Sequence, residues 1–301
     1  MSVIVAGPIA LDTIETPTEK RDNVLGGSAS YAAISASYFA PVQLVGVVGT
    51  DFPGEHLDIF RNLEIDIHGV ETAEGETFRW SGRYFDDMNQ RETVDIALNV
   101  VAAYEPKLTP SNKAARVALL ANMAPQKQLQ VLEQLESGAL IVADSMDLWI
   151  NSEREALLDL LRQIDLLVIN EGEAKLFAQT RNLITAGHRL RDLGPDHVVI
   201  KKGEHGAMLF GNGQFFSTVA YPLTEVLDPT GAGDSFAGGL VGYLSSLKKD
   251  SLDFGDLSRS IVYGTVMASF NCESFSTDRL QGLTQEQIDS RFHEFRSYTA
   301  F

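Results

Sequence analysis

The sequence has very little cysteine, no long apolar run and no surplus of positive charge. Its one cysteine, Cys272, has no second cysteine with which to form an internal disulfide, and nothing near it resembles a metal cluster or a nucleophilic site. No uninterrupted apolar stretch approaches transmembrane length, and no basic segment precedes the short apolar run at the amino terminus. These absences predict a cytoplasmic protein in which Cys272 is a buried small residue.

Positive charge is scarce relative to negative charge. The chain has 24 Lys and Arg against 41 Asp and Glu, a formal net charge of −17. So strong an acidic excess disfavours nucleic acid and anionic membrane surfaces as partners. The acidic residues are spread along the chain without long runs, so the sequence does not indicate an acidic tail.

The rest of the composition suits one large folded domain. With 44% hydrophobic residues, the 301-residue chain can bury a substantial core. No repeat, low-complexity tract or linker-like stretch divides it. We therefore predict a single domain over residues 1–301.

Short apolar runs alternate with helical patterns through the middle of the chain. Helical spacing is visible from Gln128 to Leu135 and from Glu153 to Leu161. The apolar runs are typical of strands buried on both faces of a parallel sheet. The sequence thus predicts an α/β fold, a three-layer α/β/α sandwich with a mainly parallel central sheet. The predicted strands are Arg116–Leu120, Leu140–Ala143, Leu166–Ile169 and His197–Ile200.

A glycine-containing segment from Leu227 to Phe236 carries the strongest chemical signal. Gly231 and Gly233 allow the backbone to turn and to approach a ligand closely. Helical spacing follows, so the amides of Ala232, Gly233 and Asp234 are expected in the first turn of a helix, where they point toward an anion. A carboxylate beside a bound phosphoryl group suits a general base, and this pattern predicts that role for Asp234.

The same residues also have a simpler interpretation. Asp234 or Ser235 can cap the helix, and the glycines can form an ordinary turn. The segment is not a P-loop, because no Gly-Lys-Ser/Thr follows, and it is not the dinucleotide-binding Gly-x-Gly-x-x-Gly pattern. Its longer match favours phosphoryl transfer: Asp-Pro-Thr-Gly-Ala-Gly-Asp-Ser-Phe-Ala-Gly-Gly, residues 228–239, resembles the carboxy-terminal signature of the ribokinase (PfkB) family of carbohydrate and nucleoside kinases.

This resemblance implies an ATP-dependent kinase of ribokinase-like fold with a small β lid. Asp234 would be the catalytic base, and the backbone of Gly231, Ala232 and Gly233 would form the anion hole. The helix N-terminus, a few basic side chains and Mg²⁺ would offset the acidic surplus around ATP. The helix N-terminus would also reduce the basicity of Asp234, which can still accept the proton late in a loose transition state.

The amino-terminal part resembles the same family. Val3–Gly7 is predicted as a first strand, Asp12 follows it, and Gly26 and Gly27 open a helix of small residues. The resemblance implies that Asp12, Gly26 and Gly27 bind the hydroxyl groups of the phosphate acceptor. The family often has Asn at the position of Tyr31, so a hydrogen bond to the acceptor is lost or replaced here. Without the resemblance, Asp12 is interpreted as a turn residue.

Thr77–Phe85 and Glu92–Leu98 predict an antiparallel hairpin around a polar turn. The resemblance makes residues of about 13–24 and 76–100 a lid over the acceptor, through which many family members dimerise; the alternative is an edge hairpin packed on the core. We expect Trp80 to cover a sugar face or stack on a base, and Arg91 to contact the acceptor. The aromatic residues Phe78 and Tyr84 share the first role. The alternative is that Arg79, Arg83 and Arg91 are all solvated strand charges, whereas otherwise one of them meets an anionic group on the acceptor.

Two further spacings resemble the family's nucleotide site. Asn170-x-x-Glu173 follows a predicted strand and matches the motif tied to Mg²⁺, which Glu173 would hold through water; the alternative is an ordinary helix start. Lys202, Gly203 and Gly206 form a turn suited to nucleotide phosphates or ribose, or a simple hairpin. Two more residues, Asp228 and Thr230, match a site for a monovalent cation such as K⁺, or else simple turn chemistry.

The acceptor itself stays open at this stage. A sugar or sugar derivative is the favoured acceptor, a nucleoside is the second hypothesis, and a non-catalytic sugar-binding regulator is the third. The intact Asp234 and its glycines favour an enzyme, because a binding protein does not need them. The expected partners are therefore ATP and a small sugar or nucleoside, with a homodimer formed through the lid.

Overall fold

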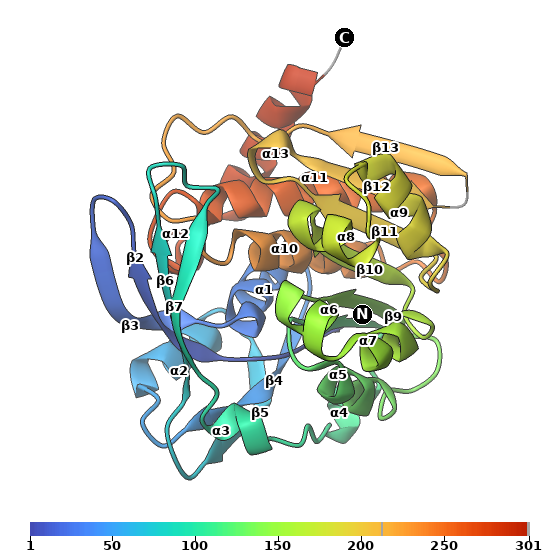
Figure 1. Cartoon of the computed structure of the whole chain (residues 1–301). Helices are drawn as coiled ribbons and strands as arrows, with labels where there is room; N and C mark the ends of the chain where they lie inside the picture. Colours follow the sequence, from blue (N-terminus) through green and yellow to red (C-terminus); the bar gives the residue numbers. More distant parts are fainter. Residues whose placement is uncertain (212, 300–301) are drawn as a thin grey trace.

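A large central sheet organises the molecule (Figure 1). The computed structural model describes residues 1–211 and 213–299. In this part of the chain the sheet has nine strands in the order β13-β12-β11-β10-β9-β8-β1-β4-β5. The strands from β11 to β5 run parallel, while β12 and β13 pair antiparallel at one edge. Their bounds are β1 Val3–Ala6, β4 Val42–Gly49, β5 Asp66–Ala73, β8 Val117–Leu120, β9 Leu140–Asp144, β10 Leu166–Asn170, β11 His197–Lys201, β12 Ala207–Gly211 and β13 Gln214–Thr218.

Each central strand is apolar throughout because both of its faces are covered. In β1, Val3 and Val5 enter one hydrophobic core and Ile4 and Ala6 enter the other. Successive side chains of a strand point to opposite faces, so a strand buried on both sides has no polar alternation. This explains why the sequence shows continuous apolar runs at these positions.

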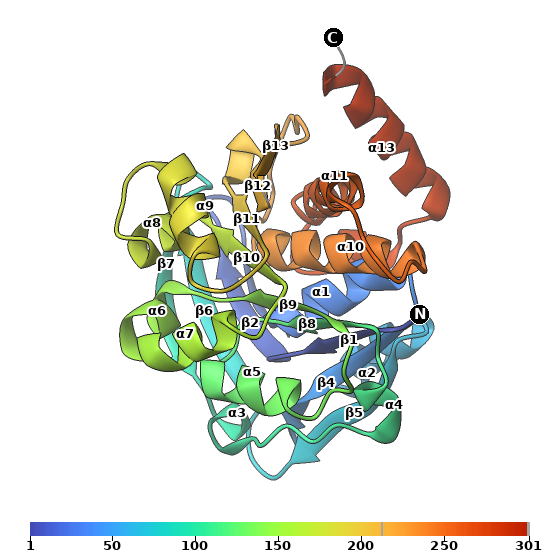
Figure 2. The same ribbon diagram turned by 90° about the vertical axis from the view of Figure 1, so that its right-hand side faces the viewer.

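Helices cover both faces of the sheet, as Figure 2 shows. One face carries α1, α2, α10, α11, α12 and α13, and the other carries α4 to α9. The first group comprises α1 Ser28–Ser37, α2 Gly54–Asn62, α10 Ala232–Ser246, α11 Phe254–Asn271, α12 Asp278–Gln281 and α13 Gln285–Thr299. The second comprises α4 Pro110–Lys113, α5 Pro125–Leu132, α6 Asp147–Ser152, α7 Arg154–Leu161, α8 Glu171–Phe177 and α9 Leu183–Arg191.

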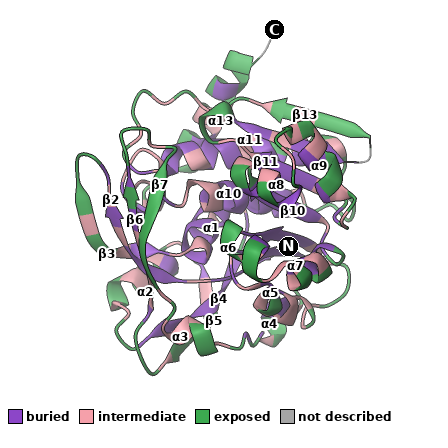
Figure 3. Ribbon diagram, in the orientation of Figure 1, coloured by how far each residue is buried: buried purple, intermediate pink, exposed green. Residues whose placement is uncertain are grey.

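A second, four-stranded sheet stands beside the carboxyl ends of the central strands. Its order is β3-β2-β6-β7, with β2 Ala10–Glu15, β3 Lys20–Gly26, β6 Phe78–Tyr84 and β7 Arg91–Ala97. Ile14 and Tyr84 pack with Phe275 in a small core of their own. The outer strand β7 is largely exposed (Figure 3). The short helix α3, Val100–Ala103, leads from it back to the main body.

The predicted three-layer α/β fold with a small additional sheet is confirmed, and the differences are local. The small sheet begins at Ala10 and includes Gly26, because β2 and β3 pair from Ala10 opposite Gly26 onward. It is therefore wider than the expected 13–24 segment, and Asp12 lies in a strand rather than a turn. Helix α5 begins at Pro125, a favoured first helical residue, ahead of the predicted Gln128. Cys272 is only half-buried.

No helix among the described residues is both long enough and apolar enough to cross a membrane.

Candidate active site

The ends of the central strands and the start of α10 bring the predicted residues together. Asp144, Asn170 and Lys201 are the last residues of β9, β10 and β11, which are neighbours in the sheet. Parallel strands end at the same edge, so their terminal side chains face one space. Asp234, in the first turn of α10, interacts electrostatically with both Asp144 and Lys201, so α10 begins at this edge.

The glycine segment has the conformation that an anion hole requires. Gly231 is the N-cap of α10 in the left-handed region, with φ 74°. A β-carbon there would lie 2.3 Å from the Tyr31 ring, so both the backbone and the packing require glycine. The Ala232 amide already donates to the Pro229 carbonyl (3.1 Å). Of the three amides expected to bind an anion, that of Gly233 is therefore the main candidate.

Buried hydrogen bonds hold this segment rigidly. Asn271 on α11 donates to the Thr230 carbonyl (2.7 Å), and its Oδ1 lies 3.1 Å from the Ser235 hydroxyl. The Asp228 carboxylate accepts from the backbone amides of Thr230 (2.8 Å) and Ser276 (2.9 Å). Asp228 thus performs turn chemistry, one of the two interpretations that the sequence left open.

The Asp234 carboxyl is more basic than its position at the N-terminus of α10 predicts. Burial raises its pKa to about 7 and Asp144 adds to the rise, while Lys201 and Arg91 lower it. We expected the helix N-terminus to make this carboxyl less basic. That expectation was wrong, because loss of hydration outweighs the attraction of the helix end. A carboxyl that titrates near neutrality is well suited to accept a proton.

The acceptor carboxylate predicted at Asp12 lies on the other side of the same space. Asp12 is 3% exposed, and its Oδ1 has no hydrogen-bond partner among the described residues. Burial raises its pKa to about 8, with contributions from Asp228 and Asp234. Gly26 faces it so closely that a β-carbon would lie 2.0 Å from the carboxyl carbon. A buried carboxylate with an unpaired oxygen is suited to receive a hydroxyl group.

Strand register explains which residues of the small sheet face the site. Asp12 is paired with Trp80, and Trp80 with Ile96, so the three side chains share one face. Four residues further along β6, Tyr84 lies on the same face and is paired with Arg91. Tyr84 reaches the glycine segment, where its hydroxyl lies 3.0 Å from Thr230 Oγ1.

The three arginines of β6 and β7 have different positions. Arg79 pairs with Asp51 (2.7 Å) and Arg83 pairs with Glu15 (3.0 Å), away from the site. Arg91 instead lowers the pKa values of Asp12, Glu173 and Asp234, so its charge acts in the space between them. Its guanidinium lies 5.6 Å from the Trp80 ring centre.

Trp80 lies in the sheet with one side of its ring against the backbone. A β-carbon at Gly82 would come within 2.0 Å of the indole, so the ring lies directly on Gly82. The indole N–H donates to the Thr93 hydroxyl (3.3 Å). Trp80 is only half-buried, which leaves ring surface available for a ligand.

The Asn170 and Glu173 motif forms a capping box at the start of α8. Asn170 Oδ1 accepts from the Glu173 amide (2.9 Å), and Glu173 Oε2 accepts from the Asn170 amide (2.8 Å). Burial and Asp144 nevertheless raise the pKa of Glu173 to about 8. This carboxyl therefore lacks sufficient positive charge nearby, a deficit that a divalent cation is suited to fill.

No three His, Cys, Asp or Glu side chains within residues 1–211 and 213–299 gather closely enough to hold a metal by themselves. The buried Glu173 carboxyl fits Mg²⁺, which usually keeps several waters and is bound through one or two carboxylates together with substrate phosphates.

The predicted nucleotide turn connects β11 to β12. Gly203 and Gly206 have φ values of 55° and 83°, and the Lys202 amide donates to the Gly206 carbonyl (2.7 Å). The tip of the β6–β7 hairpin touches this turn, since Asn89 donates to Glu204 (3.2 Å). The small sheet therefore contacts both the glycine segment and the nucleotide turn.

Two charged residues of the site were missed from sequence. Lys201, rather than its neighbour Lys202, directs a buried ammonium group toward α10, and Asp144 pairs with it at 3.0 Å. Each directly follows a predicted strand, Leu140–Ala143 or His197–Ile200, and this place was the available signal, because strand ends carry ligand-binding side chains in such folds.

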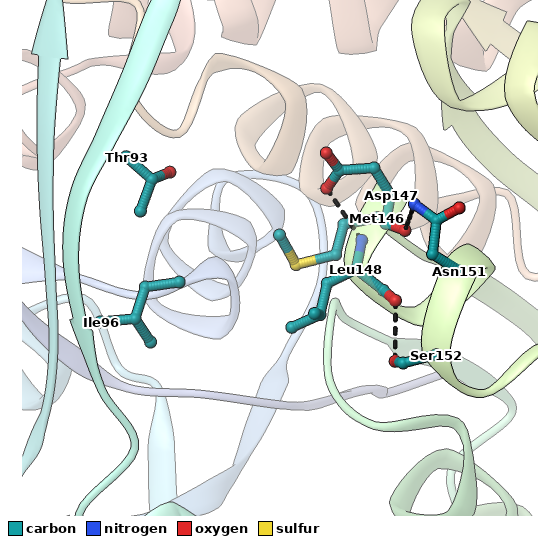
Figure 4. Close-up of a pocket in the computed structure, with 7 residues that line it drawn as sticks. All are labelled: Thr93, Ile96, Met146, Asp147, Leu148, Asn151 and Ser152. Carbon is teal, nitrogen blue, oxygen red and sulfur yellow. Dashed lines mark hydrogen bonds between the residues drawn. The ribbon is translucent and has the colours of Figure 1, made fainter.

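A pocket of about 430 Å³ opens between the small sheet and α6 (Figure 4). Thr93 and Ile96 of β7 form one wall, and residues 146–152 form the other. Ile96 is next to Trp80 across the strands, and Trp80 is next to Asp12. On the other wall, Met146 Sδ accepts from Asn122, whose carbonyl lies 3.5 Å from the Ser28 hydroxyl, beside Gly27. The pocket is thus linked to the predicted acceptor site through Trp80 on one wall and through Asn122 on the other, and no pattern in the sequence indicated it.

Comparison with known proteins agrees with this geometry. The family model described as "pfkB family carbohydrate kinase" matches residues 12–281. The chain belongs to this family. It is an ATP-dependent phosphotransferase with a ribokinase-like fold.

Among curated proteins, the chain is similar to a cytidine kinase from Thermococcus kodakarensis, with 30% identity over 81% of this chain and 88% of that protein. It is also similar to a nucleoside kinase from Methanocaldococcus jannaschii, with 24% identity over 87% of this chain and 83% of that protein. Among solved structures, a Burkholderia thailandensis nucleoside kinase in complex with inosine superposes with a TM-score of 0.81 at 20% identity, covering 98% of this chain and 99% of the other. That structural likeness supports the fold.

Proposed function

We propose that this enzyme transfers the γ-phosphoryl group of ATP to a hydroxyl group of a nucleoside. The sequence alone favoured a sugar or sugar derivative, and a nucleoside is the sugar derivative that the site suits best. The observation that carries this proposal is the pocket between β7 and α6, which is linked to Asp12 through Trp80. Asp12 would hold the sugar hydroxyls, and the pocket would hold the base.

The walls of the pocket match a planar, partly apolar group. Ile96, Met146 and Leu148 offer apolar surface, while Thr93 and Asn151 offer polar atoms at its edges. Trp80 stands between this pocket and Asp12, where its exposed ring surface can stack on a sugar or a base. The relatives named as cytidine and nucleoside kinases support the same acceptor class.

The residues of the site divide the reaction between them. Asp12 orients the acceptor, and Asp234 accepts the proton of the attacking hydroxyl group as the oxygen binds phosphorus. The Gly233 amide stabilises the charge of the transferred group from the helix end, a type of contact that is worth roughly 3 to 4 kcal/mol when a comparable donor is removed. Glu173, with Asn170, would hold water molecules of Mg²⁺, which supplies positive charge to the phosphates.

The small sheet completes the mechanism as a lid. It supplies Asp12, Trp80 and Arg91, and its tip touches the nucleotide turn through Asn89. Closure of such a lid excludes water and limits wasteful hydrolysis of ATP.

A panel of pyrimidine nucleosides, purine nucleosides, free pentoses and sugar acids, assayed with ATP, tests the acceptor. We expect kcat/KM for the best nucleoside to exceed that for free ribose by at least about a hundredfold, since the base adds binding energy. Ile96→Ser should raise the KM for the nucleoside without changing the KM for ribose. Ile184→Ser, at an equally exposed isoleucine on α9 outside both the pocket and the small sheet, is the matched control. Equal use of ribose and nucleosides would refute the proposed base pocket.

A sugar acid is the second candidate acceptor. The observation in its favour is Arg91, whose charge reaches both Asp12 and Asp234 and can pair with an anionic group. A relative from Thermoproteus tenax is named 2-dehydro-3-deoxygluconokinase, with 35% identity over 37% of this chain. In the same panel, Arg91→Met should abolish use of a sugar acid and spare an uncharged nucleoside.

We also propose the finer features that the family resemblance implies. Glu173→Gln should raise the Mg²⁺ concentration needed for half-maximal rate. A monovalent cation such as K⁺ would bind beside Asp228 and Thr230, and replacing K⁺ with tetramethylammonium tests it. The hydrogen bonds that Asp228 accepts from two backbone amides support a structural role beside that ion.

A homodimer through the lid is supported by exposed apolar side chains on β7 or directly after β6 and β7, namely Phe85, Val94, Ile96 and Leu98. Light scattering during size-exclusion chromatography measures the assembly directly, and Val94→Glu should dissociate it. We further propose a cytoplasmic location, where ATP is available; cell fractionation tests this.

A further inference from the structure

Lys201 is a buried cation at the centre of the site that no predicted role explains. It ends β11, paired with Asn170 of β10 in the sheet register. Its side chain is 15% exposed, and its only ion pair among the described residues is with Asp144, at 3.0 Å. A buried ammonium group is unfavourable unless it has both a countercharge and hydrogen-bond acceptors.

The direction of the side chain points to a ligand. A β-carbon placed on Gly233 would lie 3.1 Å from Lys201 Nζ, so the ammonium group rests against the first turn of α10. This is the turn whose amides form the anion hole. An ammonium group has three N–H donors, and Asp144 Oδ2 accepts one of them.

The charges around Lys201 favour the same interpretation. Burial alone would lower its pKa, but Asp144, Glu173 and Asp234 raise it, so the side chain keeps its proton. Three carboxyls around one ammonium group leave the site acidic, while ATP brings further negative charge. A cation fixed beside the anion hole therefore provides attraction where the phosphoryl group must lie.

We propose that Lys201 is a further catalytic residue, whose ammonium group contacts the γ-phosphoryl group of ATP beside the α10 anion hole during transfer. The bond between the γ-phosphorus and the β,γ-bridging oxygen breaks, and its electron pair leaves with ADP. A bond forms between the γ-phosphorus and the acceptor oxygen, and the hydroxyl proton passes to Asp234. Lys201 keeps its own proton and stabilises the charge on the transferred oxygens. This proposal holds for any acceptor.

Lys201→Met separates this role from a purely structural ion pair. We expect kcat to fall by roughly a hundredfold to a thousandfold, the range for loss of one donor to a developing charge. Calorimetry with Mg²⁺ provides a readout that needs no turnover. Affinity for a non-hydrolysable ATP analogue should fall by at least about tenfold, as for a lost hydrogen bond to a charged group, while affinity for AMP stays unchanged.

Lys127→Met is the matched control, because Lys127 is also a partly buried lysine in an ion pair, with Glu105 at 2.5 Å, outside the site. It should change neither kcat nor the preference for the ATP analogue over AMP. Lys201→Arg keeps the charge and should retain more activity than Lys201→Met.

Two results would overturn the proposal. One is a Lys201→Met protein that is folded and turns over at nearly the normal rate. The other is an equal loss of affinity for AMP and for the ATP analogue, which would indicate general disruption of the nucleotide site. If Lys201→Met fails to fold, the double variant Lys201→Met with Asp144→Leu removes the pair as a unit and restores an uncharged interior. Full activity in that variant would likewise refute the role of Lys201.

Discussion

The carboxyl groups of Asp234 and Asp12 are less ionised in the folded protein than they would be in water at the same pH. Burial raises the pKa of Asp234 to about 7 and that of Asp12 to about 8. The negative charge of Asp144 adds to the rise at Asp234, and the charges of Asp228 and Asp234 add to the rise at Asp12. Such raised pKa values are typical of catalytic sites, where buried groups serve ligand binding at some cost in stability. Replacing either residue should therefore slow the reaction but increase the stability of the folded protein.

We predict that Asp234→Asn lowers kcat by at least about a hundredfold, the lower range for loss of a general base. The amide has the shape of the carboxyl but cannot accept the proton. Steady-state kinetics and ATP binding on one preparation measure the effect, and binding should stay within the normal range. Near-normal turnover would remove Asp234 from the mechanism.

The same variant should be more resistant to heat at neutral pH. The unfolded carboxyl has a pKa of 3.8 against about 7 in the fold, so between these pH values the folded protein binds a proton that the unfolded chain has released. The contribution of this proton to the free energy of unfolding is therefore full in acid and is lost as the pH rises through that window. The Tm of Asp234→Asn relative to the natural protein should increase from about pH 5 to about pH 7. A difference that is independent of pH would contradict the raised pKa.

At the scale of elements, the small sheet determines how the two substrates meet. Its strands bring Asp12, Trp80 and Arg91 to one face by simple cross-strand register. Its tip touches the nucleotide turn through the contact of Asn89 with Glu204. A lid that closes on both substrates should therefore couple their binding.

Trp80→Ala should weaken acceptor use more than stability. The ring is half-buried and packs mainly on Gly82, whereas truncation of a fully buried Trp costs about 3 to 5 kcal/mol. We expect the KM for the acceptor to rise by about tenfold or more, because the stacked surface is lost. Phe215→Ala, at an exposed aromatic on the edge strand β13 of the central sheet, is the control. A large fall in Tm with unchanged kinetics would refute the lid assignment.

Asn89→Ala should reduce the coupling between ATP and the acceptor. In the natural enzyme, saturating acceptor should lower the KM for ATP, because a closed lid places Asn89 on the nucleotide turn. The variant should lose roughly half or more of this effect, as should Glu204→Ala, and the double variant should lose no more than either alone. Additive losses would show that the two side chains do not act through their mutual contact.

Sequence reasoning reached much of this arrangement, and its limits have physical causes. The buried strands could be predicted because apolar runs are local, and Asp234, Gly231 and Gly233 because their spacing is contiguous. Lys201 and Asp144 could not, because their pairing depends on strand order in the sheet. The raised pKa of Asp234 could not be predicted for a similar reason, since burial is a property of the whole fold.

At the scale of the whole molecule, the site is assembled from segments far apart in the chain. Asp12 lies in β2, Asp144 and Lys201 end strands near the middle of the chain, and Asp234 opens a helix in its last quarter. Two hydrophobic cores, one on each face of the sheet, fix these segments relative to one another. No short fragment of this protein can therefore contain the complete site.

The position of β1 also affects how the protein is made. β1 lies inside the sheet between β4 and β8, with Val3 opposite both Val42 and Val117. The ribosome releases β1 first, but its second neighbour emerges only after residue 117 has been synthesised, roughly 6 to 23 seconds later at ordinary elongation rates. Until then one apolar edge of the nascent sheet is unpaired and open to aggregation. Nascent chains arrested before β8 should consequently bind chaperones, and chains that extend past β9 should be released from them.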